Sequence, residues 1–383
     1  MRIAISTARQ AHYRLPANSF VRRGHTVTIY SSTPPGRFRG FDLSLQYRLI
    51  PAPVMLFNAL TRIPTPVALN ELDATVYDRL VALRLEECEL FLGASTSSLR
   101  TGKAAQRLGA TFVLDRACPD IRFQQAMMVE EAKKAGGVFR THAPWFLARQ
   151  VEEYEQADLL LTPSDYSRRT FPEHIRKKMV LAPLIGRSRI SPRMRKPKGS
   201  PFVVGVVGGE PLRKGYLYLL QAWKELALPN ARLKIRSGPD YKRFPVLAKL
   251  VADQPNVSII AYVPDISAFY AECDVFILPS VDDGFGMVLF EALASGVPSI
   301  ATRNTGSSEL LVAGRDAIVI DPFSVEQVKQ SLLTLYESEE ARERFAQNGQ
   351  AAVSSLMDGG KARLYEAGID RLLAAQASAL RIA

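Results

Sequence analysis

The stretch DDGFGMVLFEALASG, residues 282–296, combines carboxylates, glycines and an apolar helical pattern in a way that could support chemistry. Asp282 and Asp283 precede a Gly-Phe-Gly turn, and Glu291 follows eight residues after Asp283. A helix that starts at such a turn exposes unpaired amides and the positive end of its dipole, which attract an anion. Glycines at 284 and 286 let the backbone approach a ligand closely. The stretch therefore predicts an anion-binding loop with a carboxylate, Asp283, at its edge.

Glu291 stands among apolar residues that are typical of a buried helix. A buried carboxylate is stable only when it is paired or hydrogen-bonded. Vicinal hydroxyl groups of a ribose would be suitable donors, and the alternative is a Glu satisfied by protein amides or by an arginine. Taken alone, the residue favours the alternative, and only its surroundings reverse that preference.

The elements that must position this loop are short apolar strands alternating with amphipathic helices, which predicts parallel sheets covered on both faces. The expected strands of the first half are residues 2–6, 26–30, 90–93, 111–115 and 159–163, with helices at 71–85 and 147–157. The expected strands of the second half are residues 202–208, 232–238, 257–263, 274–280, 298–302 and 317–321, with helices at 215–227, 265–272 and 286–295. Two such domains would form a cleft at the carboxyl ends of their strands, where ligands bind in these folds.

Chain length and composition agree with two soluble domains, since 383 residues exceed one ordinary core. We expect a first domain over 1–185, a basic hinge over 186–200 and a second domain over 201–359, with a helix at about 360–383 packing back on the first. The net charge of +11 suits an anionic lipid surface or a phosphorylated substrate, and no nucleic-acid module is recognisable. Three scattered cysteines and no long apolar run favour the cytoplasm.

The segment PSVDDGFGMVLFEALASGVPSIATRNTGSSEL, residues 279–310, resembles the signature of the family 4 (group 1) retaining glycosyltransferases, which have the GT-B fold of two Rossmann-like domains. That motif has an acid before Gly-Phe-Gly, a Glu eight residues later, then Ala-x-Gly-x-Pro and a glycine-rich turn. VVGGEPLRKGYLYLLQAW, residues 206–223, is similar to the family's phosphate loop, and weaker similarity covers most of the chain. The resemblance implies an α/β, GT-B architecture with a central cleft.

The resemblance also implies roles for individual residues. Glu291 would bind the ribose hydroxyls, Asp283 the donor sugar, and Lys214 the diphosphate, while the backbone near Tyr262 and Val263 would contact the base. The implied donor-binding set comprises Gly208, Gly209, Arg213, Lys214, Tyr262, Val263, Asp283, Gly284, Phe285, Gly286, Met287, Glu291, Gly306 and Ser307.

The chain departs from the family pattern at two positions that matter for the donor. The first acid is normally Glu, whereas Asp283 is one methylene shorter, and the usual arginine five residues before the lysine is Gly209. Arg213 is expected to point elsewhere, and Arg303 is another possible substitute for the missing arginine.

The first domain is expected to bind the acceptor. Candidate acceptor contacts are Arg9, His12, Arg116 and Asp120, and the candidate catalytic residues are Asp283, Lys214, Asp115 and His142. The plain alternatives are a loop histidine at His12, loop-fixing contacts among Asp115, Arg116 and Asp120, and a structural His142.

The function expected from this resemblance is metal-independent, retaining transfer of a sugar from a nucleotide-diphosphate sugar, UDP- or GDP-linked, to a glycan or lipid-linked acceptor. No cofactor, metal site or nucleic-acid partner is expected. An anionic membrane surface is an open partner, with a peripheral position on the inner face of the cell membrane. The alternative is a non-catalytic sugar-nucleotide-binding subunit. A nicotinamide-dependent oxidoreductase is disfavoured, because GVVGGEPLRKG lacks the Gly-x-Gly-x-x-Gly spacing.

Overall fold

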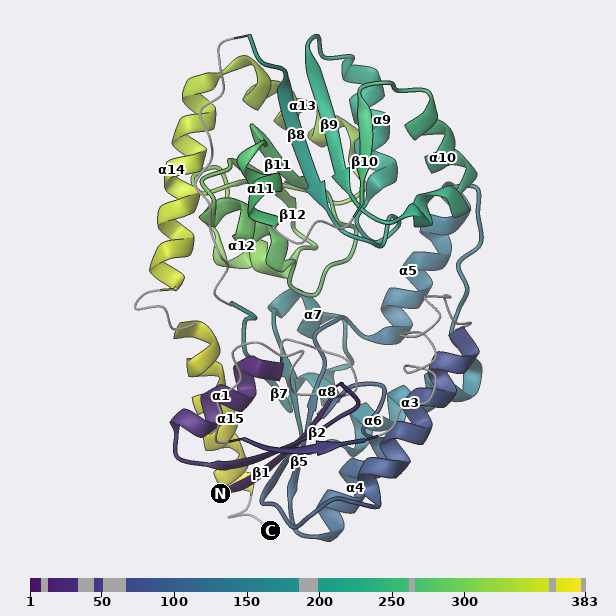
Figure 1. Cartoon of the computed structure of the whole chain (residues 1–383), viewed down its shortest axis with the longest axis vertical. Coiled ribbons are helices and arrows are strands. Elements are labelled where there is room, and N and C mark those ends of the chain that lie inside the picture. Colours follow the sequence, from purple (N-terminus) through teal and green to yellow (C-terminus); the bar gives the residue numbers. More distant parts are fainter. Residues whose placement is uncertain are drawn as a thin grey trace.

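The computed structural model of this chain describes residues 1–7, 13–33, 45–50, 67–185, 199–261, 266–357 and 363–379. Strands and helices alternate in two units, which lie one above the other along the long axis of the molecule (Figure 1). Each unit is built on one parallel sheet with helices on both faces. The predicted α/β class with two doubly wound domains is confirmed.

The first domain contains a seven-stranded sheet in the order β3-β2-β1-β4-β5-β6-β7. Its strands are β1 (Arg2–Thr7), β2 (Thr26–Ser31), β3 (Gln46–Leu49), β4 (Leu90–Ala94), β5 (Thr111–Asp115), β6 (Leu159–Thr162) and β7 (Met179–Leu181). Its helices are α1 (Arg14–Arg22), α3 (Val67–Ala82), α4 (Leu99–Arg107), α5 (Ile121–Lys134), α6 (Pro144–Gln156), α7 (Asp165–Arg169) and α8 (Glu173–Arg176). The edge strands β3 and β7 were not among the predicted strands, because they are short and largely lack fully buried residues.

The second domain contains a six-stranded sheet in the order β10-β9-β8-β11-β12-β13. Its strands are β8 (Phe202–Val207), β9 (Ala231–Arg236), β10 (Val257–Ile260), β11 (Val275–Leu278), β12 (Ser299–Thr302) and β13 (Ile318–Ile320). Its helical segments are α9 (Tyr216–Leu226), η3 (Pro239–Arg243), α10 (Pro245–Ala252), α11 (Ile266–Ala271), α12 (Met287–Ala294), η4 (Gly306–Leu310), α13 (Val325–Glu337) and α14 (Glu339–Leu356). The predicted strands of this half are all present to within a few residues.

Each sheet separates two apolar cores, because successive side chains of a strand point to opposite faces. In β8, Val204 and Val206 belong to the core formed with α9 and α13. Val203 and Val207 belong to the opposite core, which includes residues of α11, α12 and α14. A strand buried on both faces must be apolar at every position, which is why the predicted strands were continuous apolar runs.

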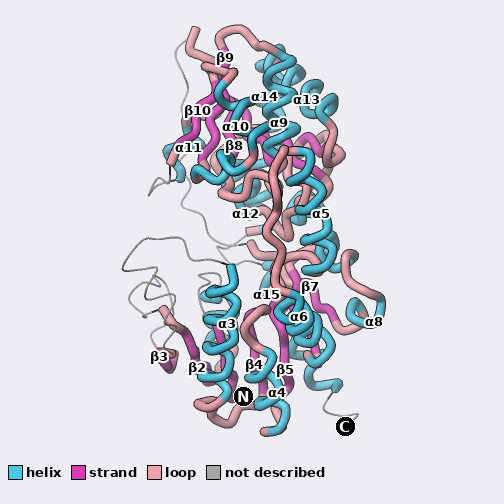
Figure 2. Tube along the Cα trace, turned by 90° about the vertical axis from the view of Figure 1, so that its right-hand side faces the viewer, coloured by secondary structure: helices cyan, strands magenta, loops and turns pink. Residues whose placement is uncertain are grey.

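The chain returns to the first domain at its end, where α15 (Arg363–Ala379) packs beside α1 (Figure 1). Glu366 of α15 accepts a hydrogen bond from Ser19 at 2.6 Å and pairs with Arg22 and Arg23. Arg371 donates to the carbonyl oxygen of Leu181 at 2.7 Å, which ties α15 to the edge strand β7. The view turned by 90° shows the same two units one above the other, each with its strands flanked by helices (Figure 2).

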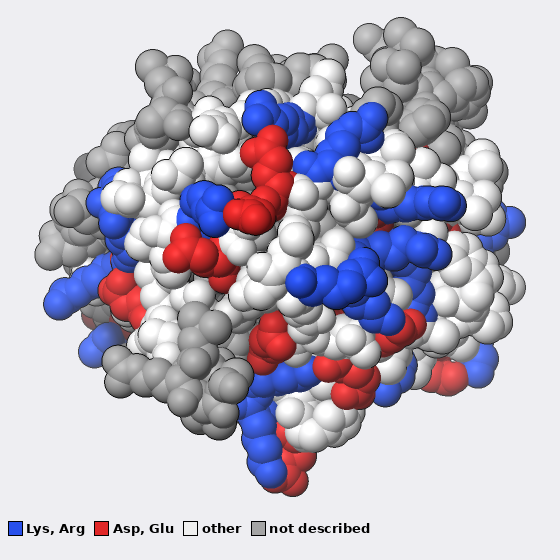
Figure 3. Space-filling model, turned by 90° about the horizontal axis from the view of Figure 1, so that it is seen from below, with Lys and Arg blue, Asp and Glu red and all other residues white. Residues whose placement is uncertain are grey.

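The free end of the first domain carries basic and acidic side chains close together rather than one continuous basic face (Figure 3). The exposed ion pairs of the first domain include Arg2 with Glu87 and Lys103 with Glu152. Exposed pairs of this kind contribute about 1 kcal/mol or less each. Among the described helices, none is long and apolar enough to cross a membrane.

Candidate functional site

The loop between β11 and α12 lies where the sequence predicted an anion-binding turn. The amide of Asp283 donates to the carbonyl oxygen of Asn304 at 2.9 Å, and the amide of Gly306 donates to the carbonyl oxygen of Asp283 at 2.9 Å. Ser307 donates its amide to Phe285 at 2.7 Å. These bonds hold the turn at the start of η4 against the loop that starts α12. The two loops are separate segments of the sequence, but these hydrogen bonds place them side by side.

Glycines are required at two positions of this loop for different reasons. Gly286 precedes α12 with φ of 76°, a left-handed conformation that other residues adopt only with strain. At Gly284, a Cβ atom would lie 2.1 Å from the carbonyl oxygen of Ala117 in the first domain. Gly284 therefore marks a close approach between the two domains, not only a flexible turn.

Asp283 forms a buried ion pair with Lys214, which lies in the loop between β8 and α9. Asp283 is 6% exposed and Lys214 is 8% exposed. Burial raises the pKa of the Asp283 carboxyl, but the charges of Lys214 and Arg213 outweigh it and bring that pKa below its ordinary value. The two residues predicted to serve the donor thus hold each other in position as a charged pair.

Arg213 lies in the same cluster instead of pointing away, which corrects the expectation from its place in the sequence. Its guanidinium forms an ion pair with Glu210 at 2.5 Å. Burial lowers the pKa of Arg213, but the charges of Asp283 and Glu210 raise it well above its ordinary value. Arg303 is not a substitute at this place, since its side chain is largely exposed and binds Asp321 at 2.8 Å.

Glu291 is half-buried rather than fully buried, on the first turns of α12. One carboxylate oxygen accepts a hydrogen bond from the Tyr270 hydroxyl at 3.0 Å. Burial raises the pKa of Glu291, and the Tyr270 hydrogen bond and the charge of Arg236 act in the opposite direction without cancelling it. A protein group therefore satisfies only part of this carboxylate, and its other oxygen remains accessible to a ligand hydroxyl.

An open pocket of about 520 Å³ lies beyond the carboxyl ends of β8, β9 and β10. Its lining includes Gly209 from the loop after β8 and Arg236 and Ser237 from the end of β9. Gly209 is exposed, and a Cβ atom there would meet nothing within 4 Å. Tyr262 and Val263, the predicted base contacts, lie outside the described residues. Gly208 directly follows β8, and its carbonyl oxygen accepts a hydrogen bond from the Tyr216 hydroxyl.

Two of the first-domain candidates fix the loop after β5. Arg116 is buried and donates from Nη2 to the carbonyl oxygen of Pro119 at 2.7 Å. Asp120 caps α5 by accepting from the amide of Arg122 at 2.8 Å and pairs with its side chain at 2.5 Å. These contacts fit the plain alternative for both residues.

Of the other first-domain candidates, Asp115 is buried and His142 lines a cavity. Asp115 is buried at the end of β5, next to Tyr13, whose pKa is raised by burial and by the Asp115 charge. His142 binds Glu71 through Nδ1 at 2.9 Å and lines a cavity between the domains. Arg9 and His12 lie outside the described residues.

The loop between β11 and α12 is held by groups of the first domain that sequence reasoning missed. Asp282 is fully buried and accepts hydrogen bonds from Gln124 of α5 at 2.5 Å and from the Tyr166 hydroxyl of α7 at 2.9 Å. The carbonyl oxygen of Gly284 accepts from Ser164 at 2.6 Å. The only sequence signal for this contact was a second acid directly before Asp283.

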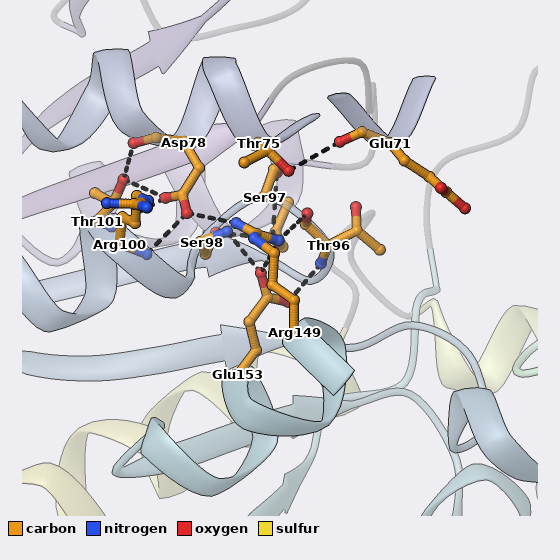
Figure 4. Close-up of polar contacts among 11 residues, drawn as sticks. Glu71, Thr75, Asp78, Thr96, Ser97, Ser98, Arg100, Thr101, Arg149 and Glu153 are labelled. Atoms are coloured by element: carbon orange, nitrogen blue, oxygen red, sulfur yellow. Dashed lines mark hydrogen bonds and ion pairs between the residues drawn. The ribbon is translucent and has the colours of Figure 1, made fainter. Parts of the chain in front are cut away.

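A buried charged network fixes the loop that follows β4 in the first domain (Figure 4). Arg149 lies between two carboxylates, 2.5 Å from Asp78 and 3.0 Å from Glu153. Glu153 also accepts from the amides of Thr96 at 2.6 Å and Ser98 at 2.9 Å. Because one cation faces two buried acids, one negative charge is uncompensated. Burial raises the pKa of Glu153 to about 7, although Arg149 and the two amides act against it.

This network predicts a pH-dependent stability. An acid whose pKa is higher in the folded chain contributes stability that is complete below its unfolded pKa and is lost as pH rises through the folded value. Between pH 5 and 8 the free energy of unfolding should therefore fall, by up to roughly 3 kcal/mol from this group. Glu153→Gln should flatten that slope in urea titrations, whereas Glu152→Gln, a neighbouring exposed glutamate, should not. An unchanged slope in Glu153→Gln would contradict the assignment.

Comparison with known proteins places this site in context. Residues 188–352 match the family model described as glycosyl transferases group 1. A capsular polysaccharide biosynthesis glycosyltransferase, CapM of Staphylococcus aureus, is 27% identical over 176 residues, which are 44% of this chain and 45% of the relative. Mannosylfructose-phosphate synthase of Agrobacterium fabrum is 29% identical over 167 residues, 40% of this chain and 37% of that protein. The matches thus span less than half the length of these curated relatives.

Solved structures extend the similarity of fold to the whole chain. Sucrose-phosphate synthase of Thermosynechococcus elongatus has a TM-score of 0.74 at 16% identity, covering 98% of this chain and 99% of that one. The Anabaena protein HepE, solved in complex with UDP and glucose, has a TM-score of 0.67 at 15% identity, covering 98% of this chain and 100% of that one. At these identities the similarity shows the fold, which is the two-domain GT-B fold.

Proposed function

From a GT-B chain whose residues 188–352 match the group 1 glycosyl transferases, we propose a retaining glycosyltransferase that uses a nucleotide-diphosphate sugar. The acceptor is a glycan or a lipid-linked sugar, and no divalent metal is required. The observation that carries the proposal is the buried Lys214–Asp283 pair, which stands at the start of α12 near an open pocket at the strand ends. The second domain, 201–359, binds the donor, and the first, 1–185, binds the acceptor.

The donor nucleotide fits the pocket beyond β8 to β10. Its volume of about 520 Å³ is within the range of ligand pockets in proteins. Glu291, with one oxygen bonded to Tyr270, offers the other to the ribose hydroxyls. HepE, a protein of the same fold, was solved with UDP and glucose, which supports a uridine donor. A guanosine donor remains the second choice.

The diphosphate lies between Lys214 and the amides that begin α12, with Gly306 and Ser307 on the neighbouring loop. Negative charge grows on the leaving phosphate as the glycosidic bond breaks, and fixed positive groups at that place lower the barrier. Lys214 supplies a full charge, and the helix start supplies a partial one. Asp283 contacts the hydroxyls of the donor sugar and keeps Lys214 oriented. The departing phosphate serves as base for same-face attack, so the chain contributes mainly position and charge.

A panel of nucleotides tests the donor class. The full chain is heated with UDP, GDP, ADP, CMP or dTDP, each with and without EDTA. A ligand at 100 times its dissociation constant adds about 2.7 kcal/mol to stability, which a thermal shift reports clearly. We expect UDP to give the largest shift and EDTA to leave it unchanged. If no nucleotide shifts the transition, the donor site is not functional and the proposal fails.

The second candidate is a sugar-nucleotide-binding subunit without turnover. Two observations favour it: Gly209 replaces a cation in the phosphate loop, and Asp283 is a shorter acid than usual. Nucleotide binding without transfer or slow donor hydrolysis would support this candidate. A position in the cytoplasm, or on the inner face of the membrane where lipid-linked acceptors reside, stays a prediction.

Replacing Glu291 by glutamine should weaken UDP binding by about 10-fold or more, because hydrogen bonds to a charged group are worth roughly 1.5–3 kcal/mol. The amide oxygen of glutamine can still accept the Tyr270 hydroxyl, so the fold should be retained. Glu272→Gln is the matched control, since this glutamate is exposed and pairs with Lys234 on the surface. Calorimetric titration with UDP measures the effect, and equal affinity and turnover in Glu291→Gln and the wild type would refute the role.

A further inference from the structure

A second cavity, of about 330 Å³, lies between the two domains. Its walls come from α5 and residues 139–142 of the first domain and from loop 209–213 and residues 240–244 of the second. Gly209 lines both this cavity and the donor pocket. A molecule in the cavity therefore lies beside the phosphate loop but outside the nucleotide pocket. That is a suitable place for a second substrate.

His142 presents a fixed imidazole to this cavity. Its Nδ1 lies 2.9 Å from Glu71 Oε1, and the Glu71 carboxylate is almost completely buried. The same oxygen accepts from the Ala143 amide at 3.2 Å, and the His142 amide donates to Gln125 at 2.9 Å. A buried carboxylate acceptor favours the tautomer with hydrogen on Nδ1, which leaves Nε2 as a hydrogen-bond acceptor. The pair thus offers a fixed acceptor to a ligand hydroxyl.

Three arginines also line the cavity: Arg140, Arg213 and Arg243. Two acids accompany them, Glu210 at 2.5 Å from Arg213 and Asp240 at 3.9 Å from Arg243. Among the described residues, Arg140 has no ion-pair partner and its side chain is exposed. Three guanidinium groups against two carboxylates leave the lining positive on balance, which suits a small anion.

The remaining wall is mainly apolar and includes the buried side chains of Ile121, Met128 and Phe244. Such a wall suits the C–H face of a sugar ring, while the polar side holds its substituents. The combination of an apolar wall, a hydroxyl acceptor and guanidinium groups is more specific than any of its parts. It does not resemble a site for a neutral apolar molecule.

We propose that this cavity binds the acceptor and that the acceptor is a sugar bearing an acidic group, a phosphate or a carboxylate. The arginines bind the acidic group, and His142 Nε2 accepts a hydrogen bond from a hydroxyl of the sugar. His142 acts here by binding and orienting the acceptor. The acceptor role rests on the proposed function, because it presupposes a donor in the adjoining pocket.

Calorimetry on the full chain tests the chemistry with three probes, glucose 6-phosphate, glucuronate and glucose. At least one acidic sugar should bind 10-fold or more tightly than glucose, because charge-assisted hydrogen bonds are the stronger kind. Tighter binding of glucose 6-phosphate assigns a phosphate, and tighter binding of glucuronate assigns a carboxylate. Glucose binding as tightly as both acidic sugars would overturn the proposal.

The double variant Arg140→Ala/Arg243→Ala locates the site. It should lower the affinity for the preferred acidic sugar by about 10-fold or more and leave the affinity for UDP unchanged. Arg107→Ala on α4 is the control, an exposed arginine remote from the cavity, and should change neither. Unchanged sugar affinity in the double variant, or competition between the acidic sugar and UDP, would show that the sugar binds elsewhere and overturn the proposal.

His142→Ala separates a ligand contact from a structural role. It should raise the acceptor KM by about 3–10-fold, the value of one neutral hydrogen bond, with little change in the donor KM. His174→Ala, an exposed histidine paired with Glu155, should change neither. A loss of kcat with both KM values unchanged would contradict the assigned contact.

The two proposals can fail separately. If no nucleotide binds but the acidic sugar does, the proposed function fails and the acceptor role with it, while the acidic-sugar site stands.

Discussion

Lys214→Met is expected to lower kcat for glycosyl transfer by about 10²–10³-fold, the cost of removing one fixed donor from a developing negative charge. Methionine keeps the length and the apolar stem of lysine but removes its charge. Lys224→Met, on the exposed end of α9, should leave kcat unchanged, since Lys224 forms only a surface pair with Asp253. Turnover is measured by release of the nucleotide diphosphate at saturating donor.

The same substitution should destabilise the chain, because it leaves Asp283 buried without its cation. Breaking a buried ion pair by removing one partner costs roughly 3–5 kcal/mol. Lys214 and Arg213 hold the pKa of Asp283 below its ordinary value against the effect of burial. The ion pair therefore stabilises the folded chain at a pH above the pKa that Asp283 has in the unfolded chain. Without Lys214 the carboxyl should protonate more readily. The loss of stability should therefore be larger at pH 8 than at pH 4.

The double variant Lys214→Met/Asp283→Asn distinguishes catalysis from folding. Neutralising both partners should restore most of the unfolding free energy, since no lone buried charge remains. Turnover should stay low, because the cation is still absent. Recovery of turnover together with stability would mean that Lys214 serves only the fold, and the role at the diphosphate would be wrong.

Asp282→Ala is the second change with a large expected effect, and it acts at the domain interface. It removes the acceptor of two hydrogen bonds from the first domain, those of Gln124 and Tyr166. Leaving these buried donors unpaired should reduce the free energy of unfolding by about 2–5 kcal/mol. Asp321→Ala, which removes an exposed pair with Arg303, should cost less than about 1 kcal/mol.

A milder pair of changes tests whether these contacts also position the donor loop. Gln124→Leu/Tyr166→Phe keeps Asp282 and removes both donors. We expect the donor KM to rise by about 10-fold. Without these contacts, donor binding itself must order the loop, which costs about 1.4 kcal/mol of binding free energy. Small-angle scattering should show a wider domain arrangement. An unchanged donor KM with a lower melting temperature would limit these residues to a structural role.

Most of the fold could be predicted from local patterns in the sequence. Short apolar runs such as residues 202–208 and 275–278 are typical of strands buried on both faces, and the helices between them favour parallel pairing. The edge strands β3 and β7 carry little of this pattern, because an edge is exposed on one side. The loop before α12 was equally local, since Gly-Phe-Gly and the spacing of Asp283 and Glu291 are visible in one stretch.

The partners of these groups were decided only by the tertiary structure. Asp282 and Gln124 are separated by 158 residues, Asp282 and Tyr166 by 116, and His142 and Glu71 by 71. No helical or strand period connects residues so far apart, so their contact depends on how helices pack and how the domains meet. The direction of Arg213 was misjudged for the same reason: Glu210 lies in the same loop, but Asp282 and Asp283, whose charges also act on Arg213, come from another loop. Sequence alone fixed the scaffold and the motif, whereas side-chain pairing across domains required the packed chain.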